Sequence, residues 1–154
     1  MSRTIWKGVF ILYILMLLNF IVIKFNGNIN GVIDTIQSNT ERRAAGESAV
    51  NLVPFRTIDT YVSDVNSGVP FINILGNIIP FVPMGFIIPL AFPSQRNIIK
   101  TMISCLFLIC SIEIIQLISF LGSFDVDDII LNQLSCFIGF MLFVTCKNAF
   151  KIVS

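Results

Sequence analysis

Residues that proteins commonly use for catalysis and for solubility are scarce in this chain. It has no histidine, which excludes the commonest general base, the commonest metal ligand and every Ser-His or Cys-His nucleophile. Only 12% of its 154 residues are charged, against roughly 25% in soluble domains. Basic residues outnumber acids by one, so nucleic acid is not an expected partner. Any chemistry must rest on carboxylates, amides or bound ions.

Cysteine is also sparse, and its spacing argues against a structural role for disulfides or zinc. The four cysteines lie within apolar runs and show no CxxC pattern; they are Cys105, Cys110, Cys136 and Cys146. This distribution predicts small apolar side chains packed inside the membrane. No cofactor and no dedicated metal site is predicted.

Apolar residues make up most of the chain. They reach 55% of the sequence, with 15 phenylalanines and a mean hydropathy of +0.88. Runs long enough to cross a bilayer, which takes about 20 residues, cover residues 5–25, 71–92, 98–121 and 127–146. The sequence therefore predicts an all-α fold, a polytopic membrane helical bundle of about four transmembrane helices that forms a single domain over residues 1–154.

The first two runs and the segment between them have distinct features. No small-x-small cleavage site follows Phe25, so the first run is expected to be an uncleaved anchor rather than a signal peptide. Residues 26–70 are polar and are expected to form an extracytoplasmic loop, with a short helix over residues 40–47 capped by Thr40. Prolines at positions 80, 83 and 89 predict that the second span is kinked or locally unwound.

The basic residues predict the orientation of the spans in the cell membrane. Those near the ends of the runs cluster at both termini and after the second run, at Arg3, Lys7, Arg96, Lys100, Lys147 and Lys151. Because short cytoplasmic segments are enriched in Lys and Arg, both termini are expected in the cytoplasm. With both termini inside, a rise of about 1.5 Å per helical residue places the polar side chains of all four spans in the outer half of the membrane. These side chains are Asn19, Asn73, Asn77, Glu113, Gln116, Asp128 and Asn132. They predict one polar layer.

Three acids stand at the start of the fourth span, at Asp125, Asp127 and Asp128. Asp125 or Asp127 could serve only as the N-cap of this helix, although one cap does not require three acids. The amides of the layer could be interhelical hydrogen-bond donors and acceptors, and Ser135 with Gly139 reads as a seam for close helix packing. Glu113 is harder to explain structurally, because a charged side chain at a helix centre costs about 2.5–3.5 kcal/mol unless it is protonated, paired or hydrated.

Together these residues resemble the VanZ-like family of small integral membrane proteins. The resemblance covers about residues 50–146. Its motifs are Asn51-Leu52-Val53-Pro54-Phe55, Asn73 with Gly76-Asn77, Pro83-Met84-Gly85-Phe86, Glu113-Ile114-Ile115-Gln116, and Asp125-Val126-Asp127-Asp128 with Asn132. It implies an association with resistance to the lipoglycopeptide teicoplanin, and binding residues among Asn77, Glu113, Gln116, Asp125, Asp127, Asp128 and Asn132.

The chain departs from the family pattern at two positions. Members usually carry an Arg just before the Asp motif, where this chain has Gly122-Ser123, and a Gly after the Asn, where it has Ser135. Without that Arg, either a loop arginine (Arg42, Arg43 or Arg56) supplies the counter-charge to the acids, or the site binds a cation.

Three functions remain open on the sequence alone. The first is a non-enzymatic envelope protein that lowers antibiotic access at the outer face, with the bilayer and a lipid-linked or amphiphilic small molecule as partners. The second is an enzyme acting on a lipid or lipid-linked cell-wall substrate, with Glu113 or Asp128 as the acid/base group, or Asp127 and Asp128 as oxygen ligands for Mg²⁺ or Ca²⁺. The third is a transporter or assembly partner, which would require a homo-oligomer.

Overall fold

The computed structural model describes residues 3–23, 28–63 and 69–150, and over these residues it is essentially all helical, which confirms the predicted class. In chain order the elements are α1 (Arg3–Leu17), the π-helix η1 (Leu18–Ile23), α2 (Ile29–Ala44), β1 (Val50–Asn51), α3 (Arg56–Ser63), α4 (Val69–Ala91), the 3₁₀-helix η3 (Pro93–Gln95), α5 (Ile98–Ile118), β2 (Phe124–Asp125) and α6 (Val126–Phe150).

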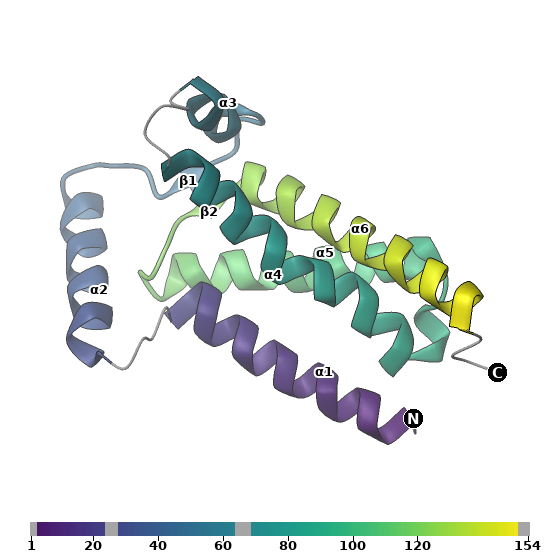
Figure 1. Cartoon of the computed structure of the whole chain (residues 1–154). Coiled ribbons are helices and arrows are strands. Elements are labelled where there is room, and N and C mark those ends of the chain that lie inside the picture. Colours follow the sequence, from purple (N-terminus) through teal and green to yellow (C-terminus); the bar gives the residue numbers. More distant parts are fainter. Residues whose placement is uncertain (1–2, 24–27, 64–68, 151–154) are drawn as a thin grey trace.

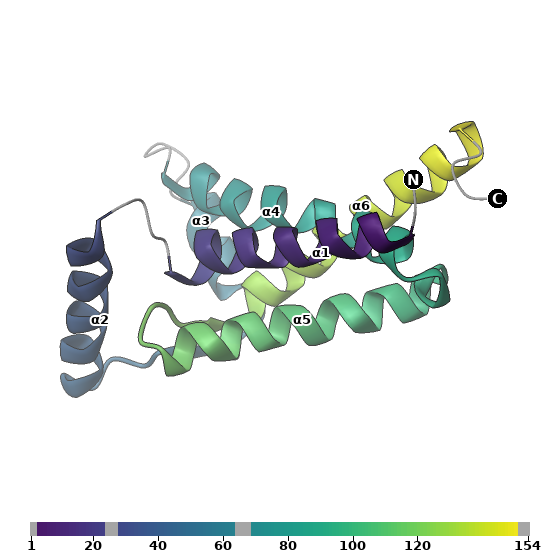
Figure 2. The same ribbon diagram turned by 90° about the horizontal axis from the view of Figure 1, so that it is seen from below.

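The four long helices α1, α4, α5 and α6 form an elongated bundle (Figure 1). Both termini lie at one end of it, and α2, α3, β1 and β2 gather at the opposite end, which we call the capped end (Figures 1 and 2). Among the described residues, three helical stretches are long and apolar enough to cross a membrane: Thr4–Ile23, Ile98–Ile118 and Val126–Lys147. Within α4, a shorter apolar stretch runs over Leu75–Ala91. These helices indicate a membrane protein.

The closest packing in the bundle joins α4 to α6. A Cβ added at Gly85 in α4 would lie 1.9 Å from the Cys136 carbonyl oxygen, and one added at Gly139 in α6 would lie 1.9 Å from that of Val82. No side chain fits at either position, so the two backbones touch there as they do at small-residue contacts between membrane helices. Gly139, with buried Ser135, forms the packing seam that the sequence predicts.

Helix α4 is continuous despite its three internal prolines, Pro80, Pro83 and Pro89, so the expected local unwinding does not occur. Neighbours supply hydrogen bonds to its carbonyls: the Tyr13 hydroxyl of α1 donates to Pro80 O at 2.7 Å, and Arg96 Nε donates to Pro89 O at 3.3 Å. The irregular turn lies instead in η1, which follows α1 without a break.

The segment expected to be a loop contains two helices. Helix α2 starts much earlier than expected, because the side chain of Asn28 caps it by accepting from Asn30 N. Thr40 is therefore not an N-cap but lies inside α2, where its hydroxyl donates to Ile36 O at 2.7 Å. Farther along, β1 pairs in parallel with β2, Val50 opposite Phe124 and Asn51 opposite Asp125. This pairing ties the segment to the start of α6.

Candidate functional site

The three acids of the Asp motif make different contacts, which explains why one helix start carries three. Asp125 is the residue before α6, and its Oδ1 accepts from Asp127 N at 2.9 Å. The same oxygen accepts from Asn51 Nδ2 at 3.1 Å, and Oδ2 accepts from the Thr57 hydroxyl at 2.6 Å. Asp125 thus caps α6, as the sequence suggests, and also joins that helix to β1 and α3.

Asp127 caps a second helix, one that is distant in sequence. Its Oδ1 accepts from Phe55 N at 2.5 Å, and its Oδ2 accepts from Thr57 N at 2.7 Å and Ile58 N at 3.2 Å. These are the free amides at the start of α3, where the helix dipole also favours a negative charge. Asp127 is fully buried, so backbone amides rather than water stabilise its charge.

Asp128 turns toward the bundle. Its Oδ1 accepts a short hydrogen bond from Asn77 Nδ2 of α4. Glu113 of α5 is 2% exposed, and its Oε2 accepts from Asp125 N at 3.5 Å. The charges of Asp128 and Asp125 both act on Glu113.

Three helices therefore contribute to one polar cluster at the capped end. It consists of Asn77 from α4, Glu113 from α5, Asp128 from the first turn of α6, and Asp125, the last residue of β2. Counting along the predicted spans indicates only that these side chains share the outer half of the membrane. The arrangement can accept hydrogen bonds, hold positive charge or pass a proton between carboxyl groups.

The other predicted layer residues form no hydrogen bond with this cluster in the described part of the chain. Gln116 donates to Ile21 O in η1 at 3.1 Å, so it acts as the interhelical link that the sequence suggests. Asn132 lies one helical turn deeper than Asp128 and is 1% exposed, and its Oδ1 has no hydrogen-bond partner within the described residues. Asn19 faces outward from the bundle. The side chain of Asn73 lies outside the described residues.

Two of the three loop arginines bind elsewhere than the acidic cluster. Arg42 pairs with Glu47 at 2.7 Å on the surface. Arg43 donates to Leu117 O and Gly122 O, both at 2.9 Å, where α5 ends, and its guanidinium lies 4.2 Å from the centre of the Phe120 ring. The third, Arg56, begins α3, the helix whose amides bind Asp127.

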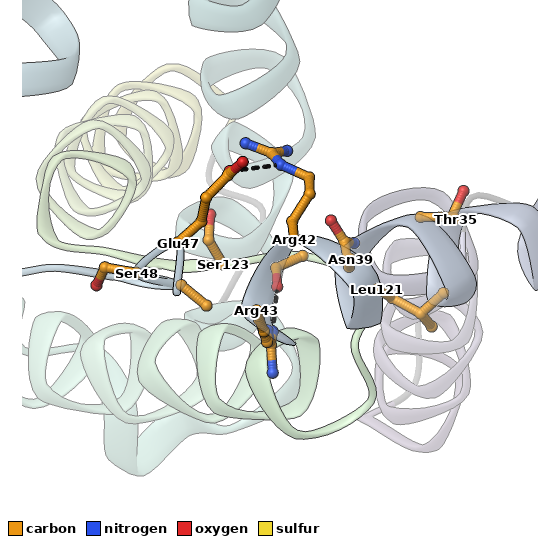
Figure 3. Close-up of a pocket in the computed structure, with 10 residues that line it drawn as sticks. Thr35, Asn39, Arg42, Arg43, Glu47, Ser48, Leu121 and Ser123 are labelled. Atoms are coloured by element: carbon orange, nitrogen blue, oxygen red, sulfur yellow. Dashed lines mark hydrogen bonds and ion pairs between the residues drawn. The ribbon is translucent and has the colours of Figure 1, made fainter. Parts of the chain in front are cut away.

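An open polar pocket of about 360 Å³ lies beside the cluster, and Figure 3 shows the side chains around it. It is lined by the second half of α2, the segment before β1 and the turn after α5: Thr35, Asn39, Arg42, Arg43, Glu47, Ser48, Ala49, Leu121, Gly122 and Ser123. Ala49 and Ser123 directly precede the paired strands that carry Asn51 and Asp125. The pocket thus adjoins the strand pair that carries Asp125 of the cluster.

Sequence reasoning missed the partners of the acids. Asn51 belongs to a motif that the resemblance uses, but neither it nor Thr57 was a predicted site residue. A threonine soon after Pro54 and near a helix start is a common cap signal, yet it does not identify an acid some 70 positions later. Within the described ranges, no group of three or more His, Cys, Asp or Glu side chains is arranged to hold a metal ion.

Comparison with known proteins agrees with the resemblance. A family model described as VanZ/LLP1 matches residues 10–147. Protein VanZ of Enterococcus faecium is 25% identical over 143 residues, which cover 93% of this chain and 76% of that protein. No solved structure gives a significant match. The matched range includes the whole polar cluster and the residues that line the pocket.

Proposed function

Because this chain belongs to the VanZ/LLP1 family, we propose that it is an integral protein of the bacterial cell envelope that lowers susceptibility to glycopeptide and lipoglycopeptide antibiotics of the teicoplanin type. It acts by binding a lipid-linked or amphiphilic molecule at the polar cluster and the neighbouring pocket. The chain crosses the cell membrane several times with both termini in the cytoplasm, so that the capped end faces outward.

One observation carries this proposal: carboxylates and an amide from separate long helices meet at one end of an otherwise apolar bundle. Asn77, Glu113 and Asp128 come from α4, α5 and α6. Burying such groups in an apolar bundle is costly, and helix packing alone does not require two acids among them. The adjoining pocket supplies room for the polar part of a ligand.

Orientation is supported by the basic residues at the end opposite the cluster. Lys7 lies in α1 near its start, Lys100 lies at the start of α5, and Lys147 lies near the end of α6. All three belong to the end of the bundle where the termini lie (Figure 1). By the positive-inside rule this end is cytoplasmic, so the acidic cluster and the pocket face the outer leaflet.

A second candidate is an enzyme acting on a lipid or lipid-linked cell-wall substrate. It is favoured by the weak hydrogen bonding of Glu113: the bond that its carboxylate accepts from Asp125 N is long, at 3.5 Å. A carboxylate held this weakly is available for proton transfer. Asp127, by contrast, accepts backbone hydrogen bonds at both oxygens, which makes it a poor acid, base or metal ligand. Membrane lipid and wall-precursor profiles with and without the protein separate the candidates: a new or missing species favours the enzyme.

The proposal is tested by expressing the gene in a susceptible bacterium and measuring growth inhibition by teicoplanin. The wild-type protein is expected to raise the inhibitory concentration, and a Glu113→Ala/Asp128→Ala double variant is expected to lose this effect. A matched control replaces exposed Asp34 on α2 by Asn, which should keep full protection. Immunoblots of the membrane fraction verify equal protein levels.

Two results would overturn the proposal. Unchanged susceptibility with wild-type protein present in the membrane would remove the antibiotic link. Full protection by the double variant would separate the effect from the polar cluster.

A further inference from the structure

Helix α2 is amphipathic, and the protein leaves its apolar side uncovered. Ile29, Ile33 and Ile36 recur at intervals of four and three residues, so they share one face. They are 65%, 53% and 37% exposed. None of the residues of α2 is buried. Large apolar side chains in such a stripe mark a surface that meets an apolar partner.

Polar contacts fix how α2 is attached to the bundle. Asn39 Nδ2 donates to Phe120 O at 2.8 Å, and Arg43 donates to two carbonyls at the end of α5. Val32 packs against the hydrophobic core of the bundle. At about 100° per residue, Val32, Asn39 and Arg43 lie on one side of α2, and the isoleucine stripe lies immediately beside them. The stripe is therefore turned partly toward the bundle rather than directly away from it.

The polar side of α2 points the other way. Asp34, Ser38 and Glu41 are all exposed and lie on the far side of the helix from the contacts with α5 by the same count of about 100° per residue. Over its length α2 carries Asp34 and Glu41 against Arg42 and Arg43, so its formal charge is balanced. An anionic partner is thus not favoured over a neutral one.

The attachment also sets the depth of α2. Helix α2 contacts the end of α5, which closes at Ile118, and follows η1, which ends at Ile23. Both α5 and η1 belong to apolar stretches long enough to span a membrane. Exposed apolar side chains reach these ends, with Phe20 63% and Ile118 69% exposed. Helix α2 runs across the end of the bundle in both views (Figures 1 and 2). It therefore lies where acyl chains give way to headgroups.

We infer that α2 is an interfacial helix that lies along the membrane surface and inserts Ile29, Ile33 and Ile36 between the lipids. Its partner is the bilayer itself, and zwitterionic headgroups suffice because the helix has no excess of basic residues. Helices of this kind bury their apolar face about 5–10 Å into the boundary between headgroups and acyl chains. Such insertion holds the polar pocket, which α2 helps to line, at headgroup level.

The test places one tryptophan on either side of α2 in the full-length protein. Trp6 is the chain's single tryptophan and is replaced by Phe. Ile33→Trp then reports on the apolar stripe, and Ser38→Trp, about 140° away around the helix, is the matched control. Each variant is reconstituted in phosphatidylcholine vesicles whose acyl chains are brominated close to the headgroup, with unbrominated vesicles as reference.

The inference predicts blue-shifted emission for Ile33→Trp, with most of it lost in brominated vesicles, and red-shifted, unquenched emission for Ser38→Trp. Red-shifted, unquenched emission from Ile33→Trp would place the stripe in water and overturn the inference. Blue-shifted emission without quenching would mean that protein, such as a second copy of the chain, covers the stripe, and would overturn it too. Equal quenching at both positions would also refute the proposed orientation.

Discussion

Replacing Asp127 by Asn should detach α3 from the start of α6. The substitution keeps the size of the side chain, but it removes the charge and one of the two acceptor oxygens. The new NH₂ group would point at backbone N–H donors, because both carboxylate oxygens now accept from such groups at 2.5–3.2 Å. At least one amide at the start of α3 would lose its partner.

The magnitude follows from the number and kind of hydrogen bonds involved. Bonds to a charged group contribute about 1.5–3 kcal/mol each, and they do not add fully, so we expect the docking of α3 to weaken by about 2–4 kcal/mol. Strain at Phe55 adds to the effect, since this residue has a φ of 66° in a region that costs about 1–2 kcal/mol outside glycine. Without Asp127, Phe55 can relax and the helix start opens.

Hydrogen–deuterium exchange of the protein in nanodiscs measures this opening directly. A loss of 2–4 kcal/mol would speed exchange at Phe55, Thr57 and Ile58 by roughly 30- to 700-fold. The matched control is Asp59→Asn, which removes an exposed acid from the first turn of the same helix and should cost about 0.3–1 kcal/mol. Equal protection of these amides in wild type and Asp127→Asn would refute the capping role.

Two further substitutions probe the packing of the bundle and the attachment of α2. Gly85→Ala should lower the melting temperature in detergent, because its methyl group would lie 1.9 Å from the Cys136 oxygen and overpacking costs about 1–3 kcal/mol or more. Gly76→Ala is the control, since the space around Gly76 is open. Equal melting temperatures of the two variants would contradict the close contact between α4 and α6. Arg43→Ala should make α2 more susceptible to limited proteolysis, because it removes two hydrogen bonds to the end of α5. The control, Arg42→Ala, breaks only an exposed ion pair worth less than about 1 kcal/mol. Similar cleavage of both variants would exclude Arg43 as the residue that attaches α2.

Local patterns in the sequence sufficed to predict the four long helices and one helix cap. Hydropathy is a property of consecutive residues, so the apolar runs coincide with α1 and η1, α4, α5 and α6 to within a few residues. The cap formed by Asp125 is equally local, since its carboxylate bonds to an amide two positions later. Counting residues along the predicted helices placed Glu113 and Asp128 only in the same half of the membrane.

Contacts between distant residues were beyond such reasoning. Nothing near Asp127 in the sequence indicates that its partners are amides some 70 positions earlier. Helix α2 was missed because its composition is polar and glycine-containing and because its N-cap, Asn28, accepts from Asn30 N at a position where no helix was expected. Arg43 was considered as a counter-charge for the acids, yet the carbonyls at the end of α5 lie closer to its position in the fold.

The short strand pair also dictates the order in which the protein can be built. Asn51 and its partner Asp125 are 74 positions apart, and ribosomes add about 5–20 residues per second, so roughly 4–15 s of synthesis separate them. During that interval neither the partner strand of β1 nor the cap of α3 has been made. The capped end therefore cannot be completed until residues 124–127 have been made, and a chain released before residue 124 would lack the strand pair and the cap of α3.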